Sequence, residues 1–192
     1  MHTLTYLTNN VEFQQAPQNL IEMLVYQKFL DDRINNIRPR DIRDIKKSFL
    51  AEMTEFDEET TESHKTWKKR DIDNKKILEE LTDVYFFLAQ MINYLYENNS
   101  NIFQGKEPLE KKNILVKIDY DFRVGNHSFT DDKRDVYLDI TEAVSKRIIN
   151  INYILQLLGH FTYLYGFTEE DIYKSYYRKW KKNLERIGKE WR

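Results

Sequence analysis

Cysteine is absent from this 192-residue sequence, and glycine and proline are scarce, with five and three residues respectively. The absence of cysteine excludes disulfide frameworks, cysteine-ligated zinc, iron–sulfur sites and thiol nucleophiles. Few helix-breaking residues, together with 32% charged and 41% hydrophobic residues, favour a helix-rich globular protein. No apolar run approaches the roughly 18 residues that a membrane-spanning helix requires, so we expect none.

The sequence also lacks a charge excess of one sign, since 30 basic and 32 acidic residues leave a net charge of -2. This balance argues against broad electrostatic binding to nucleic acid, and we expect no direct nucleic-acid partner. The N-terminal segment MHTLTYLTNNVEF lacks the basic and apolar regions of a signal peptide. A chain of this length is expected to form one domain with its own core.

Hydrophobic periodicity predicts helices over about 17–34, 40–60 and 73–98, and a last helix that begins after Thr168. Asp73 and Thr168 are residue types that favour the N-cap position. The clearest buried stripe of the third helix consists of Leu81, Val84, Leu88, Ile92 and Leu95. The chain is therefore predicted to be all-α, as a helical bundle.

The segment between the third helix and the C-terminal part has a different pattern. Residues 114–122 alternate between apolar and polar side chains, which predicts a strand, with a partner strand expected within 130–140. These two segments predict a small β-hairpin in an insertion near 112–140, although 137–158 also fits a helical periodicity. We therefore assign 99–139 to an inserted segment, and 1–98 with 140–192 to the main domain.

Two pairs of acidic residues lie on the second and third predicted helices: Glu52 with Glu55, and Glu80 with Asp83. The i, i+3 spacing places each pair on one helical face. If the helices pack antiparallel, four carboxylates converge, and their repulsion requires retained protons or divalent cations between them. Hard oxygen ligands favour Mg²⁺ or Mn²⁺. The alternative is that both pairs are solvated, since such spacings arise by chance among 32 acids.

Other side chains suit binding of a nucleotide. A Trp between lysines can stack on a base or hold phosphate, and a helical stripe with two cations can hold a polyphosphate. A Gln and an Asp one helical turn apart suit recognition of a polar planar ligand. The alternatives are a core tryptophan, an exposed amphipathic helix and a solvated helix end. The candidate binding residues are Gln27, Asp31, Lys65, Trp67, Lys68, Tyr176, Lys179, Asn183 and Arg186.

In order along the chain, these segments resemble the all-α, dimeric-type dUTPases, which are related to the MazG-like and dCTP pyrophosphatases. The matching blocks are QKFLDDRI (27–34), EMTE (52–55), KTWK (65–68), EELTD (79–83) followed by Phe87, and YRKWKKNLERIGKEW (177–191) preceded by Tyr176. The resemblance implies a helical bundle of the all-α nucleoside triphosphate pyrophosphatase type.

The resemblance further implies magnesium-dependent hydrolysis of dUTP, and of dUDP, which limits incorporation of uracil into DNA. It implies metal ligands at Glu52, Glu55, Glu80 and Asp83, with Glu52 activating the attacking water. Gln27 and Trp67 would contact uracil, and Phe87 would pack on deoxyribose. Lys65, Lys68, Tyr176, Lys179, Asn183 and Arg186 would bind phosphates. A homodimer in the cytoplasm is expected, with Mn²⁺ as a substitute metal.

Two alternatives remain open at the level of the sequence. Phe86 stands where the family commonly has a His near the base, which allows dCTP or another deoxynucleoside triphosphate as the substrate. The chain could instead be a non-catalytic helical module that binds a protein, and segment 99–139 could serve a protein partner even in an active enzyme.

Overall fold

The computed structural model describes residues 13–34, 38–69 and 71–187. These residues form seven α-helices and one short 3-10 helix, without any strand. The elements are α2 (Leu20–Asp31), α3 (Ile42–Glu58), α4 (Asn74–Glu97), η1 (Asn101–Phe103), α5 (Pro108–Asp121), α6 (Lys133–Ser145), α7 (Ile151–Leu164) and α8 (Glu169–Leu184). The all-α prediction is confirmed, and the predicted helices near 17–34, 40–60 and 73–98 correspond to α2, α3 and α4.

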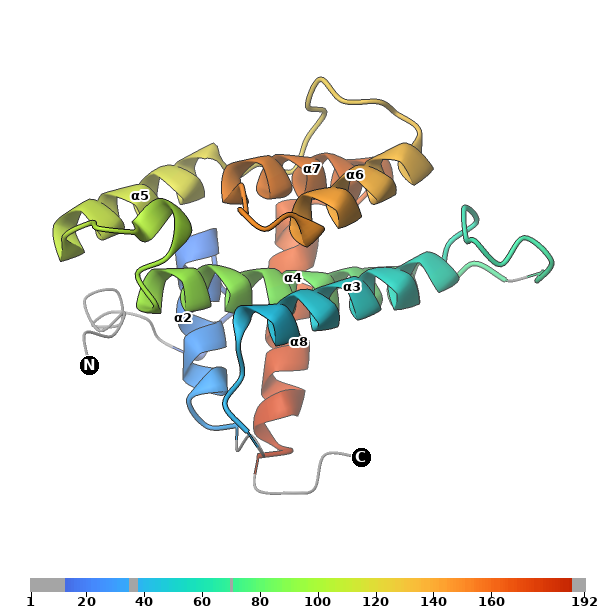
Figure 1. Ribbon diagram of the computed structural model, residues 1–192. Helices are drawn as coiled ribbons and strands as arrows, with labels where there is room; N and C mark the ends of the chain where they lie inside the picture. The colour runs from blue at the N-terminus through green and yellow to red at the C-terminus, as the bar shows by residue number, and fades with distance from the viewer. Residues whose placement is uncertain (1–12, 35–37, 70, 188–192) are drawn as a thin grey trace.

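Helices α3 and α4 form an antiparallel pair at the centre of the molecule (Figure 1). Helices α2 and α8 cross this pair, while α5, α6 and α7 lie along one side of it. In the described part of the chain, no helix is long and apolar enough to cross a membrane.

Capping side chains define where the central and C-terminal helices begin. The Asp73 carboxylate accepts the backbone N–H of Lys75 at 2.9 Å, and Thr168 forms a capping box with Asp171. Gly166, with a φ of +79°, follows the end of α7 in the left-handed region that glycine adopts without strain. The predicted caps at Asp73 and Thr168 are therefore confirmed.

Polar contacts inside the core set the positions of the crossing helices. The Trp180 Nε1–H of α8 donates to the Tyr26 carbonyl of α2 at 2.8 Å, and the Asn93 amide of α4 donates to the Leu24 carbonyl at 2.9 Å. Because each bond joins groups that are buried, breaking one would leave a donor unsatisfied at about 1–3 kcal/mol. These contacts hold α2, α4 and α8 in one arrangement.

The predicted β-hairpin near 112–140 is wrong. Residues 108–121 form α5, in which Leu115, Ile118 and the following Phe122 are buried at i, i+3 and i+7. Val116 and Tyr120, which completed the alternating pattern, are exposed. Pro108 in the first turn and a capping box at Glu107 start this helix, and both are signals that an alternating pattern does not contain.

The predicted partner strand within 130–140 is also wrong, because those residues belong largely to α6. The alternative prediction, a helix over 137–158, fits better. The structure has two helices there, however, because residues 146–150 form a non-helical connection between α6 and α7. A helix continuous over 137–158 would place Ile148 on the same face as the buried Val144, but Ile148 is 78% exposed in this break. The division into a main domain and an insertion at 99–139 stays a prediction.

The loop between α5 and α6 packs closely on α7. The His127 backbone N–H donates to His160 Nδ1 at 3.2 Å, and His160 Nε2–H donates to the Thr130 carbonyl at 3.0 Å. Gly159 permits this approach, because a Cβ there would lie 2.1 Å from the Arg123 carbonyl oxygen. The buried His160 and the adjacent Gly159 therefore hold the loop between α5 and α6 against α7.

We expect Gly159→Ala to lower the free energy of unfolding by about 1–3 kcal/mol, because the added methyl overlaps a main-chain oxygen that cannot rotate away. Gly125→Ala is the matched control, since nothing lies within 4 Å of its added Cβ. Urea unfolding monitored by circular dichroism measures both variants. Equal stability of the two variants would contradict the close packing of this loop.

Candidate active site

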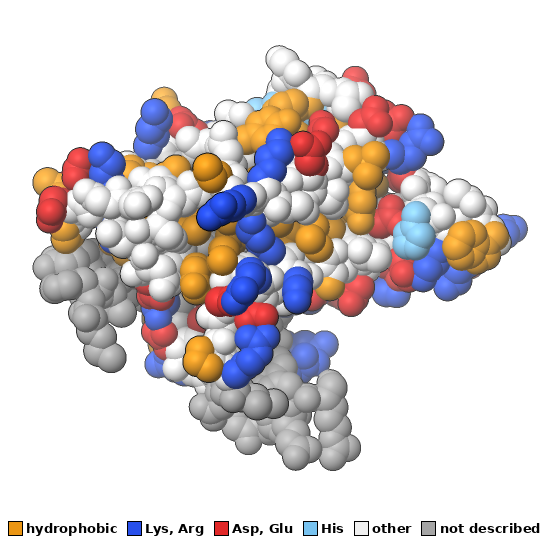
Figure 2. All heavy atoms as spheres, in the orientation of Figure 1, with side chains coloured by type: hydrophobic (Ala, Val, Ile, Leu, Met, Phe, Trp, Pro, Cys, Tyr) orange, Lys and Arg blue, Asp and Glu red, His pale blue; other side chains and the backbone are white. Residues whose placement is uncertain are grey.

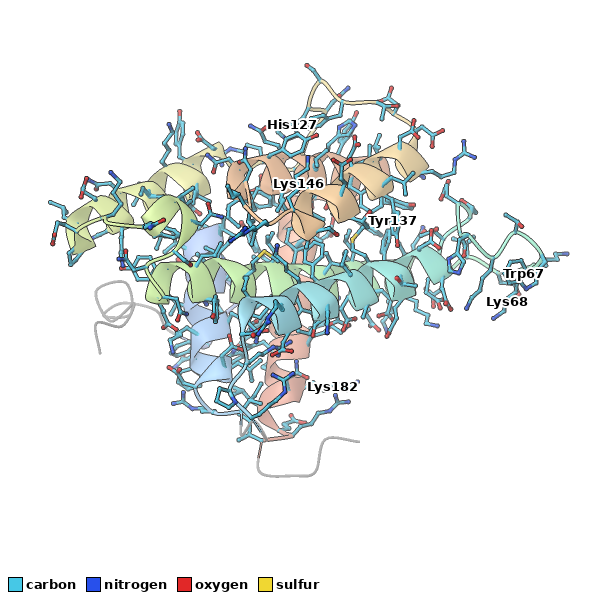
Figure 3. The ribbon with its side chains drawn as sticks, viewed as in Figure 1. Trp67, Lys68, His127, Tyr137, Lys146 and Lys182 are labelled. Atoms are coloured by element: carbon cyan, nitrogen blue, oxygen red, sulfur yellow. The ribbon has the colours of Figure 1, made fainter. Side chains whose placement is uncertain are left out.

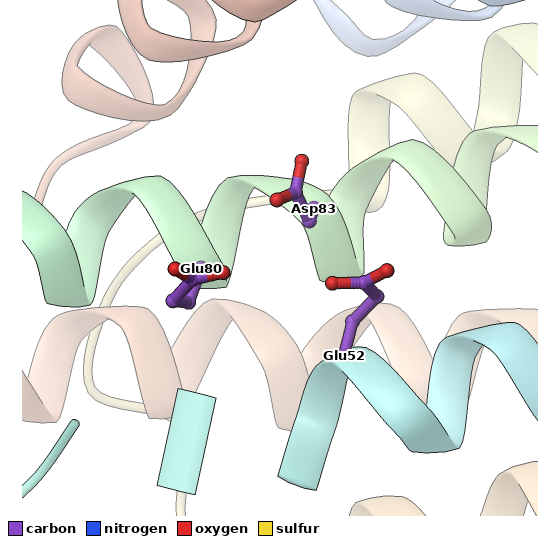
Figure 4. A group of neighbouring side chains, drawn as sticks. All are labelled: Glu52, Glu80 and Asp83. Atoms are coloured by element: carbon purple, nitrogen blue, oxygen red, sulfur yellow. The ribbon is translucent and has the colours of Figure 1, made fainter. Parts of the chain in front are cut away.

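The antiparallel pairing of α3 and α4 brings three of the predicted acidic side chains together. Single carboxylate oxygens of Glu52, Glu80 and Asp83 all lie within 4.8 Å of one another (Figure 4). Glu52 comes from the middle of α3, and Glu80 and Asp83 come from successive turns of α4. Among the described residues, no other group of three or more His, Asp or Glu side chains approaches as closely.

The surroundings of the cluster are apolar on the side of the core. Phe49, Met53 and Phe56 of α3 are fully buried, and so are Leu81 and Val84 of α4. The hydrophobic stripes of the two helices therefore face each other, and the carboxylates line the edge of that contact, half-buried. Each acid loses part of its hydration where three negative charges are close.

This environment raises the pKa values of all three acids. Burial, followed by repulsion from Asp83 and Glu55, raises the pKa of Glu52 from 4.5 to about 7. Burial also raises the pKa of Glu80 and of Asp83, while the nearby Lys179 ammonium opposes both shifts. A cluster with raised pKa values at the edge of the core is a candidate functional site.

Lys179 supplies a cation from α8. Its Nζ pairs with the Asp83 carboxylate and donates to the Glu79 carbonyl at 2.7 Å. One ammonium against three carboxylates leaves the cluster short of positive charge. Carboxylate oxygens are the donors that Mg²⁺ and Mn²⁺ prefer, so the three acids fit a divalent cation.

Glu55 lies apart from this group. It is exposed on α3 and does not belong to the set whose oxygens approach within 4.8 Å. It is nevertheless near enough for its charge to raise the pKa of Glu52. Its predicted role as a metal ligand stays a prediction.

Gln27 and Asp31 form a buried network with Tyr176 at the crossing of α2, α4 and α8. The Tyr176 hydroxyl donates to Gln27 Oε1 at 2.7 Å, and Gln27 Nε2 donates to Asp31 Oδ1 at 2.7 Å. Gln90 Nε2 donates to the same Asp31 oxygen at 2.6 Å. Phe86 is buried and stacks on the Tyr176 ring, with centroids 4.1 Å apart and an interplanar angle of 18°.

Burial dominates the ionisation of this network. It raises the pKa of Asp31 to about 6 although the amides of Gln90 and Gln27 oppose the shift. It also raises the pKa of Tyr176 well above its usual range, so the hydroxyl remains a donor. Gln27 and Asp31 thus lie together, but Gln27 is only 3% exposed and both of its amide atoms have protein partners. Their predicted contact with a ligand stays a prediction.

Phe87 follows Asp83 by one turn of α4 and precedes Gln90 by about one turn. The Arg40 guanidinium carbon lies 5.1 Å from the centroid of its ring, and Arg40 also donates to Ser48 Oγ of α3 at 2.7 Å. Arg40 and Gln90 were not among the residues predicted from the sequence. Gln90 follows Asp83 by seven residues, so helical phase could have found it, whereas Arg40 precedes α3 and has no periodic signal.

The predicted basic–aromatic residues lie on the loop that joins α3 to α4. Trp67 and Lys68 lie beyond the end of α3 (Figure 3), on a tip that projects from the body of the molecule (Figure 2). Trp67 is 78% exposed, and Lys65 pairs with Glu58. The structure does not bring these side chains to the acidic cluster, and their roles stay predictions.

The remaining predicted phosphate ligands lie at the C-terminal end of α8. Asn183 is half-buried one turn after Lys179, while Arg186 is exposed just beyond Leu184, the last residue of the helix. Neither side chain makes a contact with the described residues that assigns it a role, so both stay predictions.

A family model described as dUTPase matches residues 19–191. This match covers the acidic cluster, the buried network and the segment between α4 and α7. The chain belongs to the all-α, dimeric-type dUTPase family. The chain matches no curated protein sequence. Membership supports a hydrolase of nucleotide metabolism that acts on dUTP, at the level of the family.

The raised pKa of Glu52 gives this dUTPase a predictable dependence on pH. Between pH 4.5 and about pH 7, Glu52 holds a proton in the folded state that it has released in the unfolded state. The contribution of Glu52 to the free energy of unfolding therefore falls as the pH rises. We expect Mg²⁺ to raise the unfolding midpoint more at pH 8 than at pH 5, because bound metal must displace that proton.

Differential scanning fluorimetry with Mg²⁺ or EDTA measures this difference. Glu52→Gln should remove most of it, whereas Glu142→Gln, an exposed position on α6, should preserve it. Equal stabilisation of the wild type by Mg²⁺ at both pH values would contradict the assignment of Glu52 to a metal site.

Proposed function

We propose that this dUTPase hydrolyses dUTP to dUMP and pyrophosphate with Mg²⁺ at the Glu52–Glu80–Asp83 cluster, and that it accepts dUDP as well. The observation that supports this most directly is the approach of three carboxylates within 4.8 Å on the paired helices, with Lys179 beside them. Mn²⁺ is the expected substitute, since it prefers similar oxygen ligands.

Hydrolysis of a phosphoanhydride needs charge neutralisation and an aligned water more than covalent chemistry. Magnesium, when bound, neutralises charge on the phosphate oxygens and polarises phosphorus. Glu52, a carboxylate of this cluster, accepts the proton of the attacking water as a general base. Lys179 holds Asp83 in place and adds positive charge where the phosphates lie.

Further residues of the chain complete the proposed site. Phe87 packs against the deoxyribose, and the Gln27–Asp31–Tyr176 network lies at the end that receives the base. Glu55 completes the metal ligands, while Asn183 and Arg186 hold the phosphates. In the proposed homodimer, the exposed tip with Lys65, Trp67 and Lys68 is available to the substrate, and segment 99–139 is available to a protein partner.

A nucleotide panel tests the activity. We expect pyrophosphate release from dUTP with Mg²⁺ to exceed that from dCTP, dTTP and UTP, and to stop with EDTA. Preference for another base, as the Phe86 alternative allows, would contradict uracil specificity. Absence of any heat of Mg²⁺ or nucleotide binding would favour the helical binding module instead.

We expect Glu80→Gln and Asp83→Asn each to lower kcat for dUTP at least about a hundredfold, as loss of a group that stabilises the transition state does. Glu142→Gln is the control that replaces an exposed carboxylate of α6. Circular dichroism verifies folding of all three variants. Full activity of both cluster variants would end the metal assignment.

Trp67 offers a separate test of the exposed tip. If it contacts uracil, its emission shifts to shorter wavelength when dUMP binds, because the indole leaves water. Trp67→Phe should remove that change and leave the signal of the buried Trp180 unaltered. An identical shift in the variant would contradict a contact between Trp67 and the base.

A further inference from the structure

Basic side chains gather where the beginning of α3 meets the connection between α6 and α7. Figure 2 shows Lys and Arg side chains across the middle of this face, and Figure 3 labels Lys146 on it. The Lys46 Nζ of α3 donates to the Lys146 carbonyl, which joins two segments 100 residues apart in sequence. We call this surface the basic patch, and its cations are Arg43, Lys46, Lys47, Lys146 and Arg147.

Acidic side chains do not balance the charge of the basic patch. Arg43 pairs with Asp41, and Lys146 pairs with Glu142, but both pairs are exposed, so solvent screens them and a charged partner can compete. In the described part of the chain, the other three cations of the patch form no ion pair: Lys46, Lys47 and Arg147. A chain with a net charge of -2 therefore has a local excess of positive charge on one face.

The fold keeps these cations available to a ligand. Lys46 is half-buried, and burial lowers the pKa of its ammonium, which the Lys146 carbonyl holds at the end of α6. Lys47 is exposed, and the nearby Asp44 carboxylate is held by Arg38 instead. A cation that is already fixed loses little side-chain entropy when an anion binds, so the patch is partly preorganised.

An apolar side chain is exposed beside the cations. Ile148 follows Arg147 directly and is 78% exposed. Its neighbour Ile149 is buried, and the Ile149 carbonyl accepts the Asn101 side-chain amide at 2.6 Å. These contacts anchor the backbone of the connection and keep Ile148 in water. The patch therefore offers an apolar contact together with positive charge.

This combination fits a segment of protein better than other polyanions. Single-stranded nucleic acid binds where bases stack on aromatic side chains, and the basic patch contains none. A membrane surface needs a broad apolar face, and the patch offers one isoleucine. An acidic chain segment supplies carboxylates for the cations and an apolar side chain for Ile148, so it complements both features.

We propose that the basic patch binds an acidic segment of another protein, with its carboxylates against Lys47 and Arg147 and an apolar side chain against Ile148. The charges orient the segment and speed its association, whereas the apolar contact slows its release. The patch lies outside residues 99–139 and shares no residue with the acidic cluster, so this interaction is additional to the proposed hydrolysis and does not depend on it.

Fluorescence anisotropy with a labelled, glutamate-rich peptide that has leucines at its centre tests this assignment. We expect Lys47→Gln combined with Arg147→Gln to weaken binding about threefold to tenfold and to reduce its salt dependence, because exposed charge pairs are lost. Ile148→Ser should weaken binding about fivefold to tenfold at unchanged salt dependence, because only apolar contact is lost.

A second peptide, with serines in place of the leucines, tests the apolar contact itself. The wild type should bind it more weakly than the leucine peptide, and Ile148→Ser should cause no further loss, since the two groups act as a pair. The matched controls lie on the exposed face of α5: Lys112→Gln with Lys117→Gln, and Val116→Ser. Circular dichroism verifies folding of every variant.

Loss of affinity confined to the patch variants supports the assignment. Equal losses in the α5 controls, no measurable binding of the leucine peptide, or tighter binding of a labelled oligothymidylate or of phosphatidylserine vesicles would overturn it. None of these measurements contains dUTP or Mg²⁺, so a negative result leaves the proposed dUTPase activity unaffected.

Discussion

Repulsion among three half-buried carboxylates is the constraint on which the rest of this site depends. Glu52, Glu80 and Asp83 are held together because the apolar stripes of α3 and α4 bury their side chains against each other, and the acids lie at the edge of that contact. Hydrophobic burial of several large side chains, at about 1.5–3 kcal/mol each, outweighs the electrostatic penalty. The penalty appears as raised pKa values and as a demand for cations.

Lys179 meets only part of that demand, and its position depends on a different part of the fold. Helix α8 is anchored to α2 by the bond from Trp180 to the Tyr26 carbonyl, one residue beyond Lys179. The Tyr176 hydroxyl, on the same helix, orients Gln27. One anchored helix thus connects the charge balance at the cluster with the amide orientation in the buried network.

The sequence predicted the parts of this arrangement that depend on one helix at a time. Asp73 and Thr168 were identified as caps because capping involves only nearby backbone N–H groups. The i, i+3 spacing placed the acids on helical faces for the same reason. The hairpin prediction failed because Ile118 and Phe122 fit both a helical and an alternating pattern over so short a segment, and only packing shows that Leu115 is buried with them while Val116 and Tyr120 are exposed.

The sequence by itself determined an all-α chain, the helices that carry the acids and the family resemblance, because caps, periodicity and motif order are properties of neighbouring residues. Only the tertiary structure decided that Glu55 lies outside the close cluster and that Arg40 and Gln90 line a pocket. Only it placed Trp67 on an exposed tip. The reason is that the packing of crossing helices determines which face of each helix is buried. Hydrogen bonds between residues distant in sequence then determine which polar atoms remain unpaired.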